Sequence, residues 1–175
     1  MKKVVIVNGI PASGKSTVAK KISKHFDLPY LSIDAIKEPF MGLHAHIDRA
    51  FNRELGKAAY KVIWDAVASA PEGCVYVIDA WFGFQPKELL ESYVDQAEVV
   101  EVIEIWNQIS PESVAERYRS RLSVRKDGHP GEEYIPELIA LAQNAKPMNI
   151  GPLYHVDQDT GGEIEGVLIS LAKHA

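Results

Sequence analysis

The stretch Gly9-Ile10-Pro11-Ala12-Ser13-Gly14-Lys15-Ser16 decides how this chain folds. It fits the pattern G-x-x-x-x-G-K-[ST] at every fixed position, and it lies directly after an apolar run and directly before a helical pattern. In such a turn the glycines let successive backbone N–H groups converge on phosphate oxygens, and the helix N-terminus adds its positive dipole end at the same point. The stretch therefore predicts a phosphate-binding loop between a strand and a helix.

Two side chains of this loop are predicted to act on a bound nucleotide, which we expect to be ATP. Lys15 supplies a mobile positive charge for the β- and γ-phosphates, and the Ser16 hydroxyl is placed to bind Mg²⁺. Thr17 follows in the first helical turn, where it either contacts the nucleotide or packs and caps. The predicted nucleotide-binding residues of the segment are Gly9, Pro11, Ala12, Ser13, Gly14, Lys15, Ser16 and Thr17. The alternative, a chance match in an ordinary strand-turn-helix, is disfavoured by the spacing and the context.

Composition narrows the remaining possibilities. Hydrophobic residues make up 46% of the 175 residues, so residues 1–175 are expected to form a single domain. The 19 basic and 24 acidic residues give a net charge of −5 with no long basic tract, which disfavours binding to long nucleic acids. No run reaches the about 18 apolar residues of a membrane span, and a single cysteine excludes an internal disulfide. We expect a cytoplasmic protein without a membrane partner.

Short apolar runs alternate with longer amphipathic stretches along the chain, which is typical of βα units around a mostly parallel sheet. Strands are expected at Val4–Val7, Tyr30–Ile33, Val75–Ile78, Val99–Trp106 and Leu153–Val156. Helices are expected near 15–26, 48–70, 86–95, 111–125 and 161–173. With the phosphate-binding loop after the first strand, the pattern predicts an α/β fold of the P-loop NTPase type, with a five-stranded sheet and helices on both faces.

Two of these elements carry more specific expectations. In the second predicted helix, five residues recur at three- or four-residue spacing and are expected to face the core: Phe51, Leu55, Ala59, Val62 and Ala66. The strand Val99–Trp106 contains Glu101 and Glu104, and a strand buried on both faces should not leave carboxylates unpaired. We therefore expect that strand to lie toward an edge of the sheet.

Aspartates follow two of the predicted strands. Because the carboxyl ends of neighbouring parallel strands face one crevice, both should open into the cleft of the phosphate-binding loop. Asp79, after Val75–Ile78, is expected to hold Mg²⁺ through its water shell, or else to cap a turn. Asp34 is expected to accept the proton of an attacking hydroxyl, or to cap the short helix that starts at Ala35, and the two roles are compatible. Ala80 stands where motor ATPases place a glutamate, which disfavours that class.

Arginines gather in the fourth predicted helix. Arg117, Arg121 and Arg125 fall on one face, at positions i, i+4 and i+8. Arginine suits phosphate because its planar fork can bind two oxygens and keeps its charge. We expect Arg121 and Arg125 to stabilise the transferring phosphoryl group and Arg117 to bind the nucleotide. The alternative is a solvated face on which Glu112 and Glu116 pair with arginines.

Two further segments are expected to lie beside the cleft. Residues 125–136 are rich in turn formers and charge, so residues 117–136 are predicted to form a mobile lid. Within this lid, His129 is expected to be a surface imidazole, with a contact to phosphate as the alternative. Aromatic residues after the third predicted strand, among them Trp81 and Phe84, either wall a pocket for a small hydroxyl-bearing molecule or belong to the core.

Taken together, these features resemble the small P-loop kinases, and the most similar group is chloramphenicol phosphotransferase and its relatives. The resemblance rests on the phosphate-binding loop, the arginine lid and three short stretches: Ile33-Asp34, Val77-Ile78-Asp79 and Val156-Asp157. It implies that Asp34 takes the acceptor's proton and that Lys15 and Ser16 bind phosphate and Mg²⁺. It also implies that Asp157 lies beside the adenine, although the family's Val-Asp-Thr stretch here reads Val-Asp-Gln-Asp-Thr.

The sequence therefore predicts an ATP- and Mg²⁺-dependent phosphotransferase that moves the γ-phosphate to a hydroxyl group of a small molecule. A kinase of nucleotides or of nucleic-acid ends is an alternative among enzymes, because a local basic patch around residues 117–126 could hold one terminus. A nucleotide-binding switch without transfer is the alternative outside enzymes. The identity of the acceptor and the oligomeric state are left open.

Overall fold

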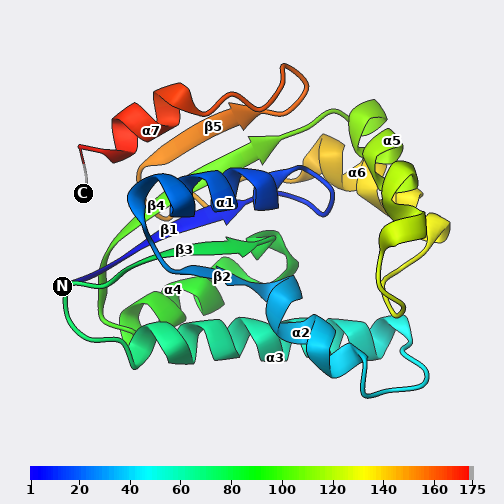
Figure 1. The fold of residues 1–175 in the computed structure, drawn as a ribbon, viewed down its shortest axis with the longest axis horizontal. Helices are drawn as coiled ribbons and strands as arrows, with labels where there is room; N and C mark the ends of the chain where they lie inside the picture. The colour runs from blue at the N-terminus through cyan, green and yellow to red at the C-terminus, as the bar shows by residue number, and fades with distance from the viewer. Residues whose placement is uncertain (174–175) are drawn as a thin grey trace.

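Five parallel strands form the centre of the computed structural model, which describes residues 1–173 (Figure 1). The strands are β1 (Lys2–Asn8), β2 (Tyr30–Ser32), β3 (Val75–Ala80), β4 (Val99–Gln108) and β5 (Leu153–Asp157). Their order in the sheet is β2-β3-β1-β4-β5, and every neighbouring pair is parallel. The predicted α/β class with a five-stranded sheet is confirmed. Because β1 is central, the loop at its carboxyl end lies near the middle of that edge of the sheet.

Helices cover both faces of this sheet (Figure 1). Within residues 1–173 they are α1 (Lys15–Phe26), α2 (Ile33–Met41), α3 (Arg49–Ala68), α4 (Lys87–Gln96), α5 (Pro111–Arg121), α6 (Ile135–Asn144) and α7 (Glu165–Leu171). α1 and α7 share one core cluster with the sheet, and α3 and α4 share the cluster on the other face. α5 and α6 pack on each other beyond the carboxyl ends of the strands. None of the helices in this part of the chain is long and apolar enough to cross a membrane.

The core face of α3 differs from the predicted one by a rotation of the helix. Its buried residues are Gly56, Ala59, Tyr60, Ile63, Trp64 and Val67. Of the predicted stripe only Ala59 is buried, and Phe51 and Val62 are exposed. Both stripes have helical spacing, so spacing alone did not separate them. The observed one buries the large rings of Tyr60 and Trp64, whose centroids are 6.3 Å apart, and aromatic rings remove the most apolar surface from water.

Strand β4 lies between β1 and β5, so the expectation that it lies toward an edge is wrong. Its fully buried Glu104 is satisfied inside the protein. Oε1 accepts hydrogen bonds from Asn8 Nδ2 (2.7 Å) and from the Met148 N–H (2.8 Å). Oε2 accepts one from the Asn149 N–H (2.8 Å), and Glu101 has an ion-pair partner of its own. Two of the partners of Glu104 come from the loop before β5, which the periodicity of β4 does not reveal.

Replacing Glu104 by alanine is expected to lower the free energy of unfolding by about 3 kcal/mol or more, because two buried donors and one partly buried donor lose their acceptor, at about 1–3 kcal/mol for each buried one. The measurement is a lower midpoint of urea unfolding with an unchanged slope. Glu163, exposed before α7, gives the matched control, and Glu163→Ala should change the free energy by about 0.5 kcal/mol or less. A Glu104→Ala protein with the wild-type midpoint would contradict the role of this carboxylate.

The region after α5 contains more regular structure than predicted. α5 ends at Arg121, and a 3₁₀ turn at Leu122–Val124 follows, so the helix expected to reach residue 125 is shorter. A further 3₁₀ turn at Glu132–Tyr134 leads into α6, which was not predicted. Pro136 lies in the first turn of α6, where proline is tolerated because its missing N–H would have no partner in the helix. The same proline was interpreted as a turn former, and for that reason this helix was not predicted.

Candidate active site

The phosphate-binding loop turns tightly between β1 and α1. Gly14 is the N-cap of α1 with φ +90°, a conformation that favours glycine, and a Cβ there would lie 2.4 Å from Gln158 Oε1. The Ser13 N–H donates to the Ile10 carbonyl (3.1 Å) and closes the loop. Lys15 Nζ donates to the same carbonyl (3.4 Å), which keeps the ammonium beside the loop. This ammonium and the positive end of the helix dipole make this end of the helix electropositive.

A buried polar network fixes the start of the loop. Asn8, the last residue of β1, accepts hydrogen bonds at Oδ1 from the Gly9 N–H (2.8 Å) and the Phe82 N–H (3.0 Å). Its amide donates to Glu104, and Asn107 Nδ2 donates to its carbonyl (3.0 Å). The carboxyl ends of β1 and β4 and the segment after β3 are thereby tied together. Asn8 was not among the predicted site residues, and the available signal for it is a polar residue at the end of an apolar strand.

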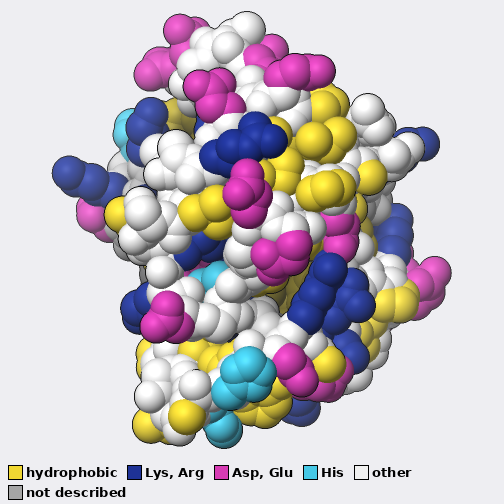
Figure 2. All heavy atoms as spheres, turned by 90° about the vertical axis from the view of Figure 1, so that its right-hand side faces the viewer, with side chains coloured by type: hydrophobic (Ala, Val, Ile, Leu, Met, Phe, Trp, Pro, Cys, Tyr) yellow, Lys and Arg dark blue, Asp and Glu magenta, His cyan; other side chains and the backbone are white. Residues whose placement is uncertain are grey.

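Beside this loop lies a cavity of about 800 Å³, within the size range of ligand pockets. From the loop and α1 it is lined by Pro11, Ala12, Gly14, Lys15, Ser16 and Thr17. The other predicted site residues that line it are Asp34, Asp79, Arg121 and Arg125. Figure 2 views the molecule from the side of α5 and α6, where Lys and Arg side chains gather in clusters between acidic ones. The fold thus brings together the phosphate-binding loop, both strand-end aspartates and two lid arginines.

Asp79 lies near the end of β3 and is 3% exposed. Its Oδ2 accepts a hydrogen bond from the Tyr30 hydroxyl (2.7 Å), whereas its buried Oδ1 has no hydrogen-bond partner within residues 1–173. Burial, and then the charge of Asp79, raise the pKa of Tyr30, so the phenol keeps its proton and remains a donor. Because Asp79 lines the cavity, its unpartnered Oδ1 is suited to bind a cation.

The donor set around Asp79 suits Mg²⁺. Ser16, which lines the same cavity, is the second protein group that could hold the ion. In the described part of the chain, no group of three His, Cys, Asp or Glu side chains could bind a metal by itself. Mg²⁺ is commonly held by one or two protein groups together with substrate phosphates and water, so this small donor set fits a magnesium–nucleotide complex.

Asp34 is the second residue of α2, whose N-cap is Ser32, so Asp34 does not cap this helix. Its side chain lines the cavity and is 58% exposed, and Lys37 Nζ lies 3.1 Å from Oδ1. Partial removal from water in the cavity acts to raise the pKa of Asp34, but the positive charges of Lys37 and Lys15 and the hydrogen bond from Lys37 outweigh it, and the pKa is lowered. The carboxylate is therefore ionised at neutral pH and within electrostatic reach of the lysine of the phosphate-binding loop.

Two of the predicted lid arginines, Arg121 and Arg125, line the cavity. Arg121 is exposed at the end of α5. The Cζ of Arg125 lies 4.7 Å from the ring centroid of Tyr118, and its Nη2 lies 3.1 Å from His129 Nδ1. The Nε of Arg125 is buried without a hydrogen-bond partner in residues 1–173. The Arg125 guanidinium is therefore positioned by Tyr118 and His129, while one of its donors stays unused.

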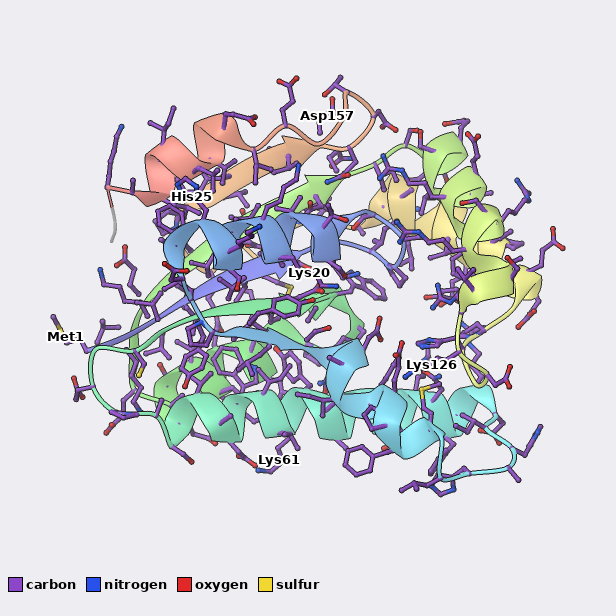
Figure 3. All side chains as sticks on the ribbon, in the orientation of Figure 1. Met1, Lys20, His25, Lys61, Lys126 and Asp157 are labelled. Carbon is purple, nitrogen blue, oxygen red and sulfur yellow. The ribbon has the colours of Figure 1, made fainter. Side chains whose placement is uncertain are left out.

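His129 lies in the predicted lid segment and is buried, with 5% of its side chain exposed, so the expectation of a surface imidazole is wrong. Arg125 can only donate to Nδ1, so Nε2–H is the donor to Glu38 Oε1 (3.1 Å). Burial and the charge of Lys37 lower the pKa of His129, in agreement with a neutral ring. Lys126, labelled in Figure 3, also pairs with Glu38 (3.2 Å), and the lid thereby contacts α2.

Four predicted nucleotide-binding residues lie outside the cavity lining: Gly9, Ser13, Arg117 and Asp157. The Arg117 guanidinium donates to the carbonyl (2.7 Å) and to Oε1 (3.1 Å) of Gln158, so it ties α5 to the segment after β5. Asp157 ends β5, and its Oδ1 accepts a hydrogen bond from the Asp159 N–H (2.9 Å). Figure 3 shows Asp157 far from Lys126. The adenine contact at Asp157 stays a prediction.

One wall of the cavity comes from the N-terminal half of α3, which was not predicted to reach the site. Four residues of this half line it: Arg49, Asn52, Arg53 and Gly56. Their spacing continues the buried stripe of α3 toward its N-terminus, so one helix face passes from the core into the cavity. The signal was present in the sequence, because counting back from Trp64 and Tyr60 in steps of three and four reaches all four positions. They were not predicted to reach the site because the set of residues expected to form the buried face of α3 was the wrong one.

Solved structures share this fold. One is a protein from Chloroflexus aurantiacus J-10-fl, described provisionally as a kinase, with a TM-score of 0.86 and 24% identity over 99% of this chain and 98% of that chain. Others are a gluconokinase from Sinorhizobium meliloti 1021 (TM-score 0.61, 18% identity, 99% and 94%) and a shikimate kinase from Aquifex aeolicus vf5 (0.59, 19%, 99% and 98%). No family model matches the sequence, and no curated protein matches it significantly. The fold of small kinases is confirmed, and the nearer relation to chloramphenicol phosphotransferase stays a prediction.

Proposed function

We propose that the protein is an ATP- and Mg²⁺-dependent phosphotransferase that moves the γ-phosphate of ATP to a hydroxyl group of a small molecule. The observation that carries this proposal is that one cavity is lined by Lys15 and Ser16 of the phosphate-binding loop and by the carboxylates of Asp34 and Asp79. Structures with the same fold include a gluconokinase and a shikimate kinase, which agrees with a small acceptor.

Each group has a defined part in the proposed transfer. Lys15 binds the β- and γ-phosphates, and Asp34, kept ionised by its basic neighbours, orients the acceptor hydroxyl and takes its proton. Arg121 and Arg125 hold the oxygens of the phosphoryl group during transfer. Ser16 and Asp79 would hold Mg²⁺, which when bound neutralises charge that develops on the phosphate oxygens. The rate comes mainly from positioning and electrostatics, because phosphoryl transfer needs little other chemistry from the protein.

Transfer from γ-labelled ATP to a panel of sugars, hydroxy acids, nucleosides and amino alcohols tests this proposal. We expect label in one class of acceptor, at a rate at least about tenfold above ATP hydrolysis without acceptor, because the pocket positions a hydroxyl for attack. Removal of Mg²⁺ with a chelator should stop the reaction. Label in nucleoside diphosphates or oligonucleotide ends would support a nucleotide or nucleic-acid-end kinase instead. Label in inorganic phosphate alone would support a hydrolysing switch.

A further inference from the structure

The cavity is more positively charged than the molecule as a whole. Seven basic side chains line it: Lys15, Lys37, Arg49, Arg53, Arg121, Arg125 and Lys126. The carboxylates that line it are Asp34, Glu38, Asp79 and Glu137. The lining thus has an excess of three positive charges in a chain whose net charge is −5. Such a concave basic surface favours anionic ligands.

Most of these cations are already engaged. Four have side-chain partners in the protein: Lys37 with Asp34, Lys126 with Glu38, Arg49 with Glu137, and Arg125 with His129. Lys15 and Arg121 belong to the phosphate-binding loop and to the lid, which face the proposed nucleotide. Arg53, on α3, is exposed and lines the cavity, and its side chain forms no ion pair or hydrogen bond within residues 1–173. It is therefore a guanidinium without an ion pair on the α3 wall of the cavity, and α3 is a different element from the phosphate-binding loop and from α5.

The wall beside Arg53 leaves room for a ligand. Gly56, less than one helical turn further along α3, lines the cavity, and apart from its chain neighbours and the helix backbone no heavy atom lies within 4 Å of the position that a Cβ would take. Glycine inside a helix is disfavoured relative to alanine, so Gly56 lowers the stability of α3 and leaves open volume in the cavity. Asn52 on the same face donates to the Gly128 carbonyl (2.5 Å) and accepts from Lys37 (3.4 Å). Its side chain therefore links α3 to α2 and to the segment around Gly128.

We infer that Arg53 binds an anionic group of the acceptor, so that the substrate is a small hydroxyl compound bearing a carboxylate or a phosphate. The inference rests on the proposed function and adds the substrate class to it. A guanidinium can bind either group through two parallel hydrogen bonds. It also offsets the repulsion that an anionic acceptor would meet from ATP and from Asp34 in the same cavity.

The transfer step balances with this acceptor in place. The acceptor hydroxyl oxygen forms a bond to the γ-phosphorus while the bond from that phosphorus to the β–γ bridging oxygen breaks. ADP leaves with the bridging oxygen, and the hydroxyl proton passes to Asp34. The anionic group of the acceptor takes no part in these bond changes, so Arg53 acts on binding and orientation.

Binding of acids and of their neutral counterparts, measured with Mg²⁺ and a non-hydrolysable ATP analogue present, tests the inference. The probes are gluconate and shikimate with their primary amides, and glycerol 3-phosphate with glycerol. We expect at least one acid to bind about tenfold or more tightly than its neutral counterpart, as one charge-assisted hydrogen-bonded pair provides. Arg53→Gln should remove most of that difference and leave the affinity for the analogue unchanged. The responding acid shows whether the group is a carboxylate or a phosphate.

Lys61→Gln is the matched control. Lys61 lies on the outer face of the same helix, 62% exposed and paired with Asp65 (Figure 3), so this variant should leave all affinities unchanged. Equal binding of acids and neutral counterparts, no binding of any acid, or unchanged acid affinity in Arg53→Gln overturns the inference. Failure of the proposed function is a different result: an acid that binds through Arg53 but never receives phosphate leaves the anion subsite standing and contradicts the kinase.

Discussion

Replacing Asp34 by asparagine is expected to slow phosphate transfer by about 10²–10⁴-fold, the usual contribution of a positioned general base. The amide keeps the size of the side chain but cannot accept the hydroxyl proton as a carboxylate does. ATP should still bind, because the phosphate-binding loop is unchanged in this variant. The measurement pairs the kcat of transfer from γ-labelled ATP with the Kd of a non-hydrolysable analogue.

Asp65→Asn is a suitable control, since Asp65 is an exposed carboxylate paired with Lys61 on the outer face of α3. It should alter neither transfer nor nucleotide binding. An Asp34→Asn enzyme that transfers phosphate at the wild-type rate would contradict the role of Asp34 as the base. It would leave a nucleotide-binding cavity without an assigned catalytic carboxylate.

The pH dependence of transfer also tests the role of Asp34 as the base. Burial opposes its ionisation, but Lys37 and Lys15 outweigh burial and lower its pKa below the ordinary value. A lowered pKa means that the base form is present at all higher pH values and is lost only as the pH falls through that pKa. Transfer should therefore show no loss attributable to Asp34 between about pH 8 and pH 5, and a loss in that window would have to come from another group.

Much of the fold was predictable from local pattern, and the errors have identifiable causes. All five strands were predicted because a buried parallel strand is a short, nearly continuous apolar run. Helix α6 was missed because Pro136 marks either a turn or the first turn of a helix, and only tertiary contacts decide between them. The position of β4 was wrong because Glu104 finds its hydrogen-bond donors in Met148 and Asn149, which are far along the chain.

The candidate site was predictable where a residue's place follows from topology. Asp34 and Asp79 follow strands that run parallel, so the order of strands and helices along the chain is enough to predict that they meet Lys15 in one cavity. Arg53 could not be placed in this way. Its proposed role depends on the rotation of α3. Two stripes of α3 have helical spacing, and aromatic packing against the sheet decides which of them is buried.

The second large effect is expected for Lys15→Ala, which should weaken ATP binding by about 10- to 100-fold and also slow transfer. A charge-assisted hydrogen bond to phosphate contributes about 1.5–3 kcal/mol, and its loss accounts for the change in Kd. The same ammonium stabilises charge on the phosphoryl group in the transition state, so kcat falls as well. Titration with the ATP analogue and single-turnover transfer separate the two effects.

Lys20→Ala on the exposed side of α1 (Figure 3) is the control for this variant and should bind and transfer as the wild type does. The Lys15 and Asp34 variants should differ in pattern, because the first loses binding and transfer together and the second loses transfer alone. Lys15 also lowers the pKa of Asp34, so any residual transfer by Lys15→Ala should be lost at a higher pH than in the wild type. If Lys15→Ala bound ATP and transferred phosphate as the wild type does, the assignment of residues 9–16 as the phosphate-binding loop would be wrong. The roles proposed for the other cavity residues, which depend on that loop, would then be wrong as well.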